Sequence, residues 1–261
     1  MAGRTVTDHL DRTVEYPYPP KRIVSLVPGI TDTLFSLGLG NRVAGRTRFC
    51  VHPQGEVEGI PRVAGTKDLN LEKIRNVRPE LILAEKEENT KEMVEQLEKE
   101  FPVYVFEIRS VHDAYNMIND LGDITGTSEK AETLIADIQA GFSRLPDFRG
   151  KRFAYCIWKK PYMVVGGDTY IQSVFELMGL VNAFSGFGDR YPSVTEEDFQ
   201  MAGLDYLFLS TEPFPFNEEH VRKFASILPD VNVMLLNGEM LWYGPRMLEA
   251  AEYFSRVFMR V

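Results

Sequence analysis

Cysteine and histidine, the side chains that most often hold transition metals, are scarce in this sequence. Its 261 residues include only two cysteines, Cys50 and Cys156, and four histidines. A structural zinc site usually needs about four such ligands in close pairs, and only Cys50 and His52 lie close together. Because the two cysteines are far apart in the chain, we expect free thiols and no structural zinc site.

Basic charge and long apolar runs are lacking too. The net charge of −9 and the pI of about 5.1 argue against a nucleic-acid-binding protein, which would carry a basic surface. No apolar run reaches the roughly 18 residues of a membrane-spanning helix. The charged first residues, "MAGRTVTDHLDRTV", lack the apolar core of a signal peptide. We therefore expect a cytoplasmic protein if Met1 is the native start, or an exported protein whose signal has been removed.

Two common catalytic signatures are also missing. The sequence has no G-x-S-x-G motif, so a nucleophilic serine has no local signature. The segment "VVGGDTY", residues 164–170, resembles a phosphate-binding loop but lacks its lysine. We interpret it as a tight strand-to-helix turn in which Asp168 caps the helix. These features favour a binding protein over an enzyme.

What the sequence does contain is a regular alternation of short apolar and longer amphipathic segments. This pattern predicts parallel β-sheets covered by helices. The longest predicted helix covers residues 128–145, with Ser128 as its N-cap and apolar residues at helical spacing. The predicted strands are residues 22–27, 42–47, 62–66, 80–85, 103–108, 152–158, 205–210 and 231–237.

The two halves of the chain resemble each other. Residues 71–85, "LEKIRNVRPELILAE", align without a gap with residues 196–210, "EEDFQMAGLDYLFLS", and Glu72 falls on Glu197. The repeat of a helix-turn-strand unit indicates two lobes of the same build. We predict an α/β fold with two Rossmann-like lobes, residues 1–126 and 148–261, joined by a long helix at residues 127–147.

Aromatic and basic side chains gather near the predicted strand ends. Ligands of parallel α/β folds bind at the carboxyl ends of the strands, and several rings of ~150–250 Å² each would suit a large, flat, partly anionic ligand. The alternative is that these rings pack between the lobes. The aromatic residues are Phe49, Trp158, Tyr162, Tyr191, Phe214, Phe216, Trp242 and Tyr243, and the basic ones are Arg46, Arg48, Lys67, Lys159, Lys160, Arg190 and Arg246.

The segment "GRTRFCVHP", residues 45–53, allows other interpretations. Cys50 and His52 could bind a metal together with a carboxylate such as Glu87, in a cytosolic enzyme or metal-binding protein. Cys50 could also be a nucleophile with His52 as its base, because residues i and i+2 of an extended segment face the same side. The third interpretation is that the segment forms the lip of a ligand cleft, with Arg46, Arg48 and Phe49 as contacts.

Three segments resemble the cobalamin- and ferric-siderophore-binding proteins of ABC importers, within the helical-backbone metal receptor superfamily. They are "TVTDHLDRTVEYPYPPKRIVSLVPGITDTLFSLGLGNRVAG", "RVAGTKDLNLEKIRNVRPELILA" and "RYPSVTEEDFQMAGLDYLFLS", in the family's order. The resemblance implies the fold of a class III periplasmic binding protein, in which a rigid helix joins two lobes that hold the ligand between them. The zinc and manganese relatives use histidines that this chain lacks, so import of a bare metal ion is not expected.

The resemblance also implies roles for single residues. Glu72 and Glu197 match acidic positions that meet arginines of the two permease subunits. Tyr191 matches an aromatic ligand contact of the second lobe, while Thr66 stands where cobalamin binders carry an aromatic residue. The full set of expected ligand contacts is Arg46, Arg48, Phe49, Cys50, His52, Thr66, Lys67, Trp158, Lys159, Tyr162, Tyr191, Trp242, Tyr243 and Arg246.

The resemblance finally implies partners and a location. The expected partner is a permease dimer with its ATPase, and the expected ligand is a corrinoid, a haem or another iron chelate rather than an intrinsic cofactor. We expect a monomer in the periplasm or another extracytoplasmic space.

Overall fold

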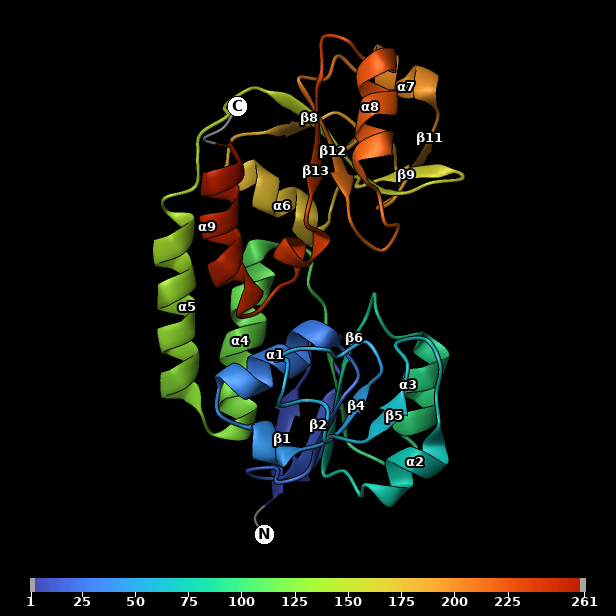
Figure 1. Ribbon diagram of the computed structural model, residues 1–261. Helices are drawn as coiled ribbons and strands as arrows, with labels where there is room; N and C mark the ends of the chain where they lie inside the picture. The colour runs from blue at the N-terminus through green and yellow to red at the C-terminus, as the bar shows by residue number, and fades with distance from the viewer. Residues whose placement is uncertain (1–2, 259–261) are drawn as a thin grey trace. The chain divides into compact units, whose positions relative to one another are not determined.

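The computed structural model describes residues 3–258 as two compact units (Figure 1). Unit 1 comprises the residues up to Ile108 together with His112–Asp137. Unit 2 comprises Arg109–Val111 and the residues from Ile138 onward. The helices are α1 (Pro28–Ser36), α2 (Leu71–Asn76), α3 (Lys91–Leu97), α4 (Val111–Thr125), α5 (Ser128–Phe142), α6 (Tyr170–Leu177), α7 (Glu196–Met201), α8 (Glu218–Ile227) and α9 (Arg246–Phe258), with short 3₁₀ helices η1 (Gly40–Arg42) and η2 (Gly238–Leu241).

Unit 1 is built on a parallel sheet of five strands in the order β5-β4-β3-β6-β7. The chain starts at the central strand, moves to one edge and then returns to the other side of β3. The topological switch therefore lies between β3 and β6, and the carboxyl ends of these strands form the expected ligand edge. The strands are β3 (Ile23–Ser25), β4 (Val43–Thr47), β5 (Arg62–Ala64), β6 (Leu81–Glu85) and β7 (Val103–Phe106).

Strand burial in unit 1 follows from this arrangement. Every residue of β6 and β7 is buried, as expected for parallel strands covered on both faces.

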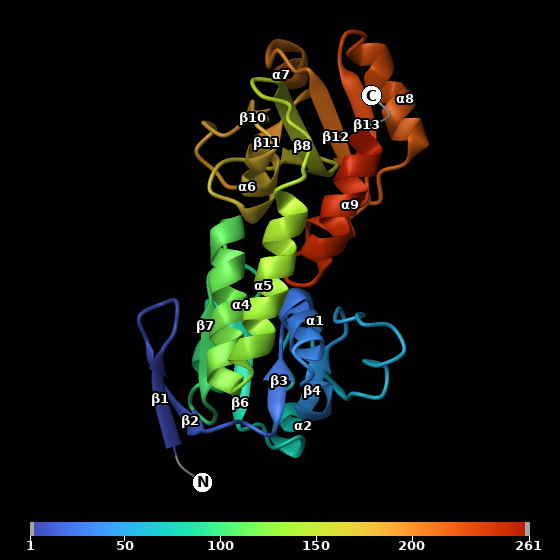
Figure 2. The same ribbon diagram turned by 90° about the vertical axis from the view of Figure 1, so that its left-hand side faces the viewer.

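Helices α4 and α5 lie side by side in both views (Figures 1 and 2). Their close approach needs glycine at position 122, because a Cβ there would lie 2.6 Å from the Cβ of Ala131.

The sequence interpretation missed a β-hairpin at the start of unit 1. Strands β1 (Gly3–Thr7) and β2 (Thr13–Pro17) pair antiparallel, and Figure 2 shows them beside β7. Asp8 in the turn is buried and accepts a hydrogen bond from the amide of Val105 in β7. His9, in the same turn, binds Asp120 of α4 with Nε2 2.9 Å from the carboxylate.

Unit 2 has a mixed sheet rather than the purely parallel sheet that we expected. Strands β8 (Arg152–Trp158), β12 (Tyr206–Ser210) and β13 (Asn232–Leu236) are parallel, and β10 (Val181–Asn182) pairs parallel with the start of β8. The antiparallel strands are β9 (Tyr162–Val164), which pairs with the end of β8, and β11 (Ser193–Val194). The α/β fold class is confirmed, and this antiparallel ribbon is its main departure from the prediction.

The predicted internal repeat is present at the same offset in the structure. Helices α2 and α7 begin at Leu71 and Glu196, and strands β6 and β12 begin at Leu81 and Tyr206. In unit 1 the Arg22 guanidinium donates to the carbonyl of Val77, at the end of α2, with Nε 2.9 Å away. In unit 2 Arg152 Nε donates to the carbonyl of Ala202, at the end of α7, over 3.1 Å.

The repeat extends to the backbone. Each helix is followed by a residue in the left-handed region, Arg78 (φ 45°) in unit 1 and Gly203 (φ 61°) in unit 2. Glycine adopts this conformation freely, whereas other L-residues pay roughly 1–2 kcal/mol. Unit 1 therefore carries strain at a position where unit 2 does not.

This difference gives a test of stability. We expect Arg78→Gly to raise the free energy of unfolding by about 0.5–1 kcal/mol, because relief of strain exceeds the added entropy of the unfolded chain. The matched change Gly203→Ala should lower it by about 1 kcal/mol. Urea unfolding followed by circular dichroism measures both, and a lower midpoint for Arg78→Gly would contradict this account.

Candidate functional site

Arg46 and Cys50 support the loop after β4 from inside and do not face solvent. Arg46 is 1% exposed, and its guanidinium donates to the carbonyls of Val57 (2.7 Å) and Cys50 (3.0 Å). Burial lowers the pKa of Arg46. These contacts close the loop on itself, so Arg46 shapes the candidate site without lining it.

The thiol of Cys50 contacts two hydroxyl groups. Its Sγ is 3.1 Å from Thr31 Oγ1 and 3.1 Å from Thr47 Oγ1. Burial raises the pKa of the Cys50 thiol above its usual value, despite these hydrogen bonds. Because the reactive form of cysteine is the thiolate, this environment disfavours the nucleophile interpretation.

Arg48 and Phe49, which lie between the buried residues Thr47 and Cys50, form the surface of this loop. Phe49 is 45% exposed, and the guanidinium of Arg48 lies over its ring, 4.7 Å from the centroid. Arg48 Nη1 also binds Asp68 Oδ2 at 2.6 Å, which ties the loop after β4 to the loop after β5. Lys67 is exposed on that second loop, whereas His52 is buried.

Glu85, which the sequence interpretation did not single out, organises the carboxyl edge of unit 1. It ends β6, is 3% exposed, and accepts hydrogen bonds from the amides of Glu87 (2.8 Å), Glu88 (2.9 Å) and Ile108 (3.4 Å). Desolvation by burial raises the pKa of Glu85 to about 7. Glu85 therefore joins the loops that follow β6 and β7.

Asn89 extends this network to the other strands. Its side chain accepts a hydrogen bond from the amide of Glu85 (3.0 Å) and donates to the carbonyls of Thr66 (2.8 Å) and Leu26 (3.4 Å). The loops after β3, β5, β6 and β7 are thus linked across the topological switch. Thr66 takes part in this network through its backbone carbonyl, not through its side chain.

At the carboxyl edge of unit 2, aromatic side chains form a cluster around Phe214. Trp158 ends β8, is 40% exposed and meets Phe214 edge to face, with centroids 5.9 Å apart. Phe214 also contacts Phe216 and His220. Lys159 Nζ lies 3.1 Å from His220 Nε2 and 5.9 Å from the centroid of Phe214.

His220 is half-buried in this cluster, where its ring contacts Phe214 and Phe216. Its Nδ1 lies 2.9 Å from Oδ1 of Asn217, the residue that caps α8, and donates a hydrogen bond to it. Desolvation first, and then the charge of Lys159, lowers the pKa of His220. Nε2 of the neutral imidazole accepts a hydrogen bond from the Lys159 ammonium, so the pair presents one positive charge at this edge.

Tyr162 is turned toward the helices. Its ring meets Phe199 of α7 and Phe224 of α8 edge to face, with centroids 6.0 and 5.3 Å apart. Its hydroxyl donates to Glu196 Oε1 (3.2 Å) and accepts from Lys223 Nζ (2.9 Å). The structure thus shows Tyr162 packed beside α7, and its expected contact with ligand stays a prediction.

The segment after β13 contains the second tryptophan. Trp242 Nε1 donates to Glu212 Oε1 at 2.5 Å. Tyr243 meets Tyr170 edge to face, with centroids 5.8 Å apart. Arg246 begins α9 and binds Glu249 at 2.7 Å, with its side chain 13% exposed. Tyr191 is half-buried just before β11.

The two expected docking carboxylates occupy equivalent positions. Glu72 and Glu197 are each the second residue of a six-residue helix, and both are exposed. The side chain of Asn70 caps α2, and Thr195 and Asp198 form a capping box at α7. Glu197 therefore stands between Glu196, which binds Lys223, and the capping residue Asp198.

The turn at residues 164–170 differs in one detail from the prediction. Thr169, rather than Asp168, is the N-cap of α6, and its hydroxyl accepts from the amide of Gln172 at 3.2 Å. Asp168 has φ 57° and binds Arg109 at 3.3 Å. The side chain of Asp168 is thus directed to a partner in the 109–111 segment.

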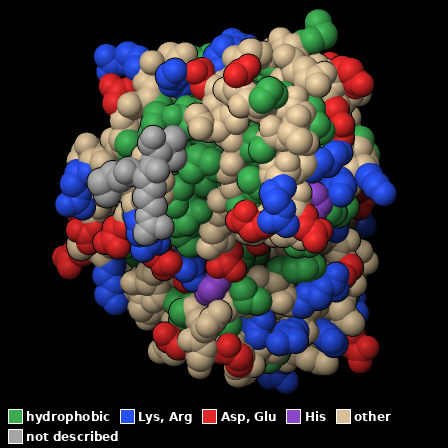
Figure 3. Space-filling model, turned by 45° about the horizontal axis from the view of Figure 1, so that its top comes forward, with side chains coloured by type: hydrophobic (Ala, Val, Ile, Leu, Met, Phe, Trp, Pro, Cys, Tyr) green, Lys and Arg blue, Asp and Glu red, His purple; other side chains and the backbone are tan. Residues whose placement is uncertain are grey.

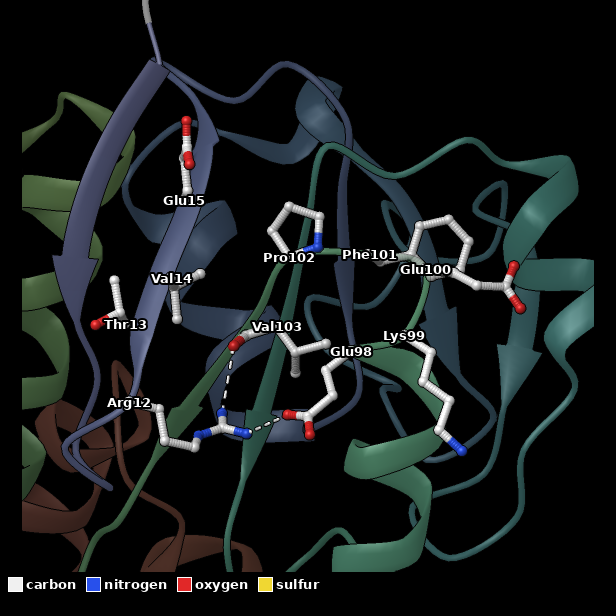
Figure 4. A pocket seen from close by; sticks show the side chains of 10 residues that line it. All are labelled: Arg12, Thr13, Val14, Glu15, Glu98, Lys99, Glu100, Phe101, Pro102 and Val103. Atoms are coloured by element: carbon white, nitrogen blue, oxygen red, sulfur yellow. Dashed lines mark hydrogen bonds and ion pairs between the residues drawn. The ribbon is translucent and has the colours of Figure 1, made fainter.

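A hollow of about 420 Å³ lies elsewhere in unit 1, beside the amino end of β7 (Figure 4). Arg12 lies at its wall and donates to Glu98 and to the carbonyl of Val103. None of the residues expected to contact ligand lines it. We therefore do not assign the ligand to this hollow.

On the face in Figure 3, basic side chains lie among acidic ones. Among residues 3–258, no group of three or more histidine, cysteine or acidic side chains is placed to hold a metal ion. Within the same range no helix is long and apolar enough to cross a membrane. The metal-site interpretation of Cys50 and His52 therefore finds no third ligand in this range.

The model of a family described as periplasmic binding protein matches residues 23–226. The chain belongs to the periplasmic binding protein family. Its curated relatives in this family include the vitamin B12-binding protein of Vibrio cholerae serotype O1, 27% identical over 248 residues, which are 90% of this chain and 88% of that protein. The vitamin B12-binding protein of Pectobacterium carotovorum is 24% identical over 247 residues, covering 89% and 86%.

Solved structures of periplasmic binding proteins share the fold. The periplasmic vitamin B12 binding protein of Vibrio cholerae superposes with a TM-score of 0.75 at 23% identity, covering 93% of this chain and 98% of that one. A heme binding protein, HmuT, gives a TM-score of 0.78 at 18% identity, covering 98% and 90%. These similarities confirm the fold class.

The buried carboxyl of Glu85 predicts a pH dependence of stability. Below pH 4.5, the ordinary pKa of glutamate, the group is protonated in both the folded and the unfolded state. As pH rises from 4.5 to about 7 only the unfolded state is ionised, so the free energy of unfolding falls, and above about 7 the loss is complete. The neighbouring Glu87 and Glu88 charges act in the same direction.

Glu85→Gln isolates this contribution, because its side-chain oxygen can still accept the amides of residues 87 and 88. The difference in unfolding free energy between wild type and variant should change by up to about 3 kcal/mol between pH 4.5 and 8. Urea titrations at several pH values measure it. A difference that does not vary with pH would contradict a raised pKa for Glu85.

Proposed function

We propose that this protein is the substrate-binding component of an ABC importer and that its ligand is a corrinoid. The observation that carries the proposal is the family match, together with the vitamin B12-binding relatives that align with most of the chain. In this role the protein binds its ligand at the carboxyl edges of the two sheets, works outside the cytoplasm and catalyses no reaction.

The side chains at these edges support a large, flat ligand. Unit 1 offers the exposed ring of Phe49 with Arg48 above it. Unit 2 offers Trp158 and the Phe214 cluster with Lys159, and the segment that contains Trp242. Aromatic faces favour a macrocycle, and the lysine suits a ligand with anionic or carbonyl groups.

Haem and ferric siderophores are the competing ligands of the same class. All three kinds of ligand bring their metal already held by a chelator, so the protein need not supply several metal ligands. This agrees with the lack of a cluster of metal-binding side chains among residues 3–258. We place the corrinoid first because the curated relatives that align with most of the chain are vitamin B12-binding proteins, and we use haemin and a ferric catecholate as comparison probes.

Ligand binding can be tested with the two tryptophans. Cyanocobalamin should bind with a Kd well below 100 µM, and Trp158→Ala or Trp242→Ala should each raise the Kd roughly 10- to 30-fold, as expected for aromatic residues at the centre of a site. Phe101→Ala, which shortens an aromatic side chain before β7, should leave it unchanged. Calorimetry and absorbance titrations measure the Kd values.

The comparison probes decide between ligands. Tight binding of haemin or the ferric catecholate with no binding of cyanocobalamin would replace the corrinoid by another chelate. If none of the three binds more tightly than about 100 µM, which is roughly −5.5 kcal/mol, the ligand class is wrong.

We further propose that Glu72 and Glu197 dock the protein onto arginines of the two permease subunits. Their equivalent positions in a repeated module suit a partner with twofold symmetry. Replacing both by glutamine should lower uptake of labelled cyanocobalamin at least about tenfold, since each change removes one partner of a charge pair, while the Kd for ligand stays the same.

Uptake is measured in cells that also express a corrinoid permease with its ATPase. Glu129→Gln is the matched control, because Glu129 is likewise an exposed carboxylate in the first turn of a helix, α5. Full uptake by the double variant would show that the two glutamates do not dock the protein.

A further inference from the structure

The indole of Trp242 is held by a carboxylate of the same unit. Trp242 follows η2, and its Nε1 donates to Glu212 Oε1 over 2.5 Å. Glu212 comes from a different segment, two residues after the end of β12. A hydrogen bond to an ionised acceptor is stronger than one between neutral groups, so it restrains the ring more than packing alone would.

Glu212 is itself fixed from inside the sheet. The amide of Glu212 donates to Ser210 Oγ (3.3 Å), and this hydroxyl donates back to the carbonyl of Glu212 (2.5 Å). Ser210 Oγ also accepts from the hydroxyl of Tyr155 over 2.8 Å. Tyr155 and Ser210 are each 1% exposed, so the turn that carries Glu212 rests on a buried chain of hydrogen bonds.

Gly238 allows the segment after β13 to approach this turn. A Cβ at position 238 would lie 2.4 Å from Glu212 Cγ and 2.8 Å from Ser210 Oγ. The amide of Gly238 donates to Thr211 Oγ1 at 3.0 Å. The two segments are therefore in direct contact at the point where the Glu212 side chain leaves the turn.

We propose that Glu212 is a positioning residue for ligand binding, which holds the Trp242 indole in its binding orientation before the ligand arrives. The proposal rests on the ligand role of Trp242 proposed above. It assigns a function to a residue outside the set of expected ligand contacts. Its physical basis is preorganisation, because a side chain that is already ordered loses less entropy when the ligand binds.

Trp158 provides the contrast within the same unit. It is 40% exposed and meets Phe214 edge to face, a contact that leaves more freedom to the ring than a short hydrogen bond to a carboxylate. The chain has only these two tryptophans. In a Trp158→Phe background, tryptophan fluorescence therefore reports on Trp242 alone.

The first experiment measures the ring itself and needs no ligand. In the Trp158→Phe background, Glu212→Ala should raise quenching of Trp242 by acrylamide and lower its fluorescence anisotropy. Glu212→Gln should restore the values of the parent, because the amide oxygen still accepts the indole N–H. Unchanged fluorescence in Glu212→Ala, or a Glu212→Gln variant that behaves like Glu212→Ala, overturns the proposal.

The second experiment is a double-mutant cycle with cyanocobalamin, haemin and the ferric catecholate as probes. For a probe that binds, Glu212→Ala should raise the Kd roughly three- to tenfold, and Glu212→Gln much less. In a Trp242→Phe background, Glu212→Ala should have no further effect, because Glu212 acts through the indole. Equal effects in the two backgrounds overturn the proposal.

Circular dichroism and thermal unfolding show whether each variant folds. If Glu212→Ala fails to fold, Glu212→Asp replaces it in both experiments, because the shorter side chain moves the acceptor away from the indole. Glu212→Asp should then raise the Kd and the acrylamide quenching more than Glu212→Gln does. If no probe binds the parent protein, the proposed function fails. The fluorescence experiment still decides whether Glu212 positions Trp242.

Discussion

In each unit the position of a short helix depends on one arginine that ties the start of a sheet strand to the end of that helix. Arg22 and Arg152 donate to the last carbonyls of α2 and α7. Helices of six residues are too short to be stable alone, so these bonds and the N-terminal caps hold them in place. The orientation of Glu72 and Glu197 follows from this restraint, because each stands one residue into its helix.

Much of the fold could be predicted from the sequence because most of its helices and strands have a recognisable local sequence pattern. The apolar run of residues 152–158 is a strand with those bounds, and the repeat places α2 and α7 at the same offset. The hairpin β1–β2 was missed because charged and proline residues mask its alternating burial. The two- and three-residue strands of unit 2 are too short to give a period, so its mixed sheet could not be predicted.

The candidate site was less predictable because burial of a polar side chain depends on partners that are distant in sequence. Arg46 cannot be told from its neighbour Arg48 in the sequence, but its side chain is buried and donates to the carbonyl of Val57. Glu85 ends a strand and would pass for a solvated acid, yet amides of two loops surround it. The sequence does predict a place for the site, the carboxyl edge of each sheet, because this edge follows from the order of the strands; that place stays a prediction.

The two tryptophans of unit 2 suit different tasks in the proposed binding role. Glu212 restrains Trp242 through a hydrogen bond, and Ser210 and Tyr155 restrain the backbone that carries Glu212. Trp158 is restrained mainly by a ring contact. A fixed ring adds contact area with little loss of entropy, whereas a freer ring can adjust to the outline of the ligand at some cost. Affinity would then depend mostly on the fixed ring, and tolerance of different ligands on the freer one.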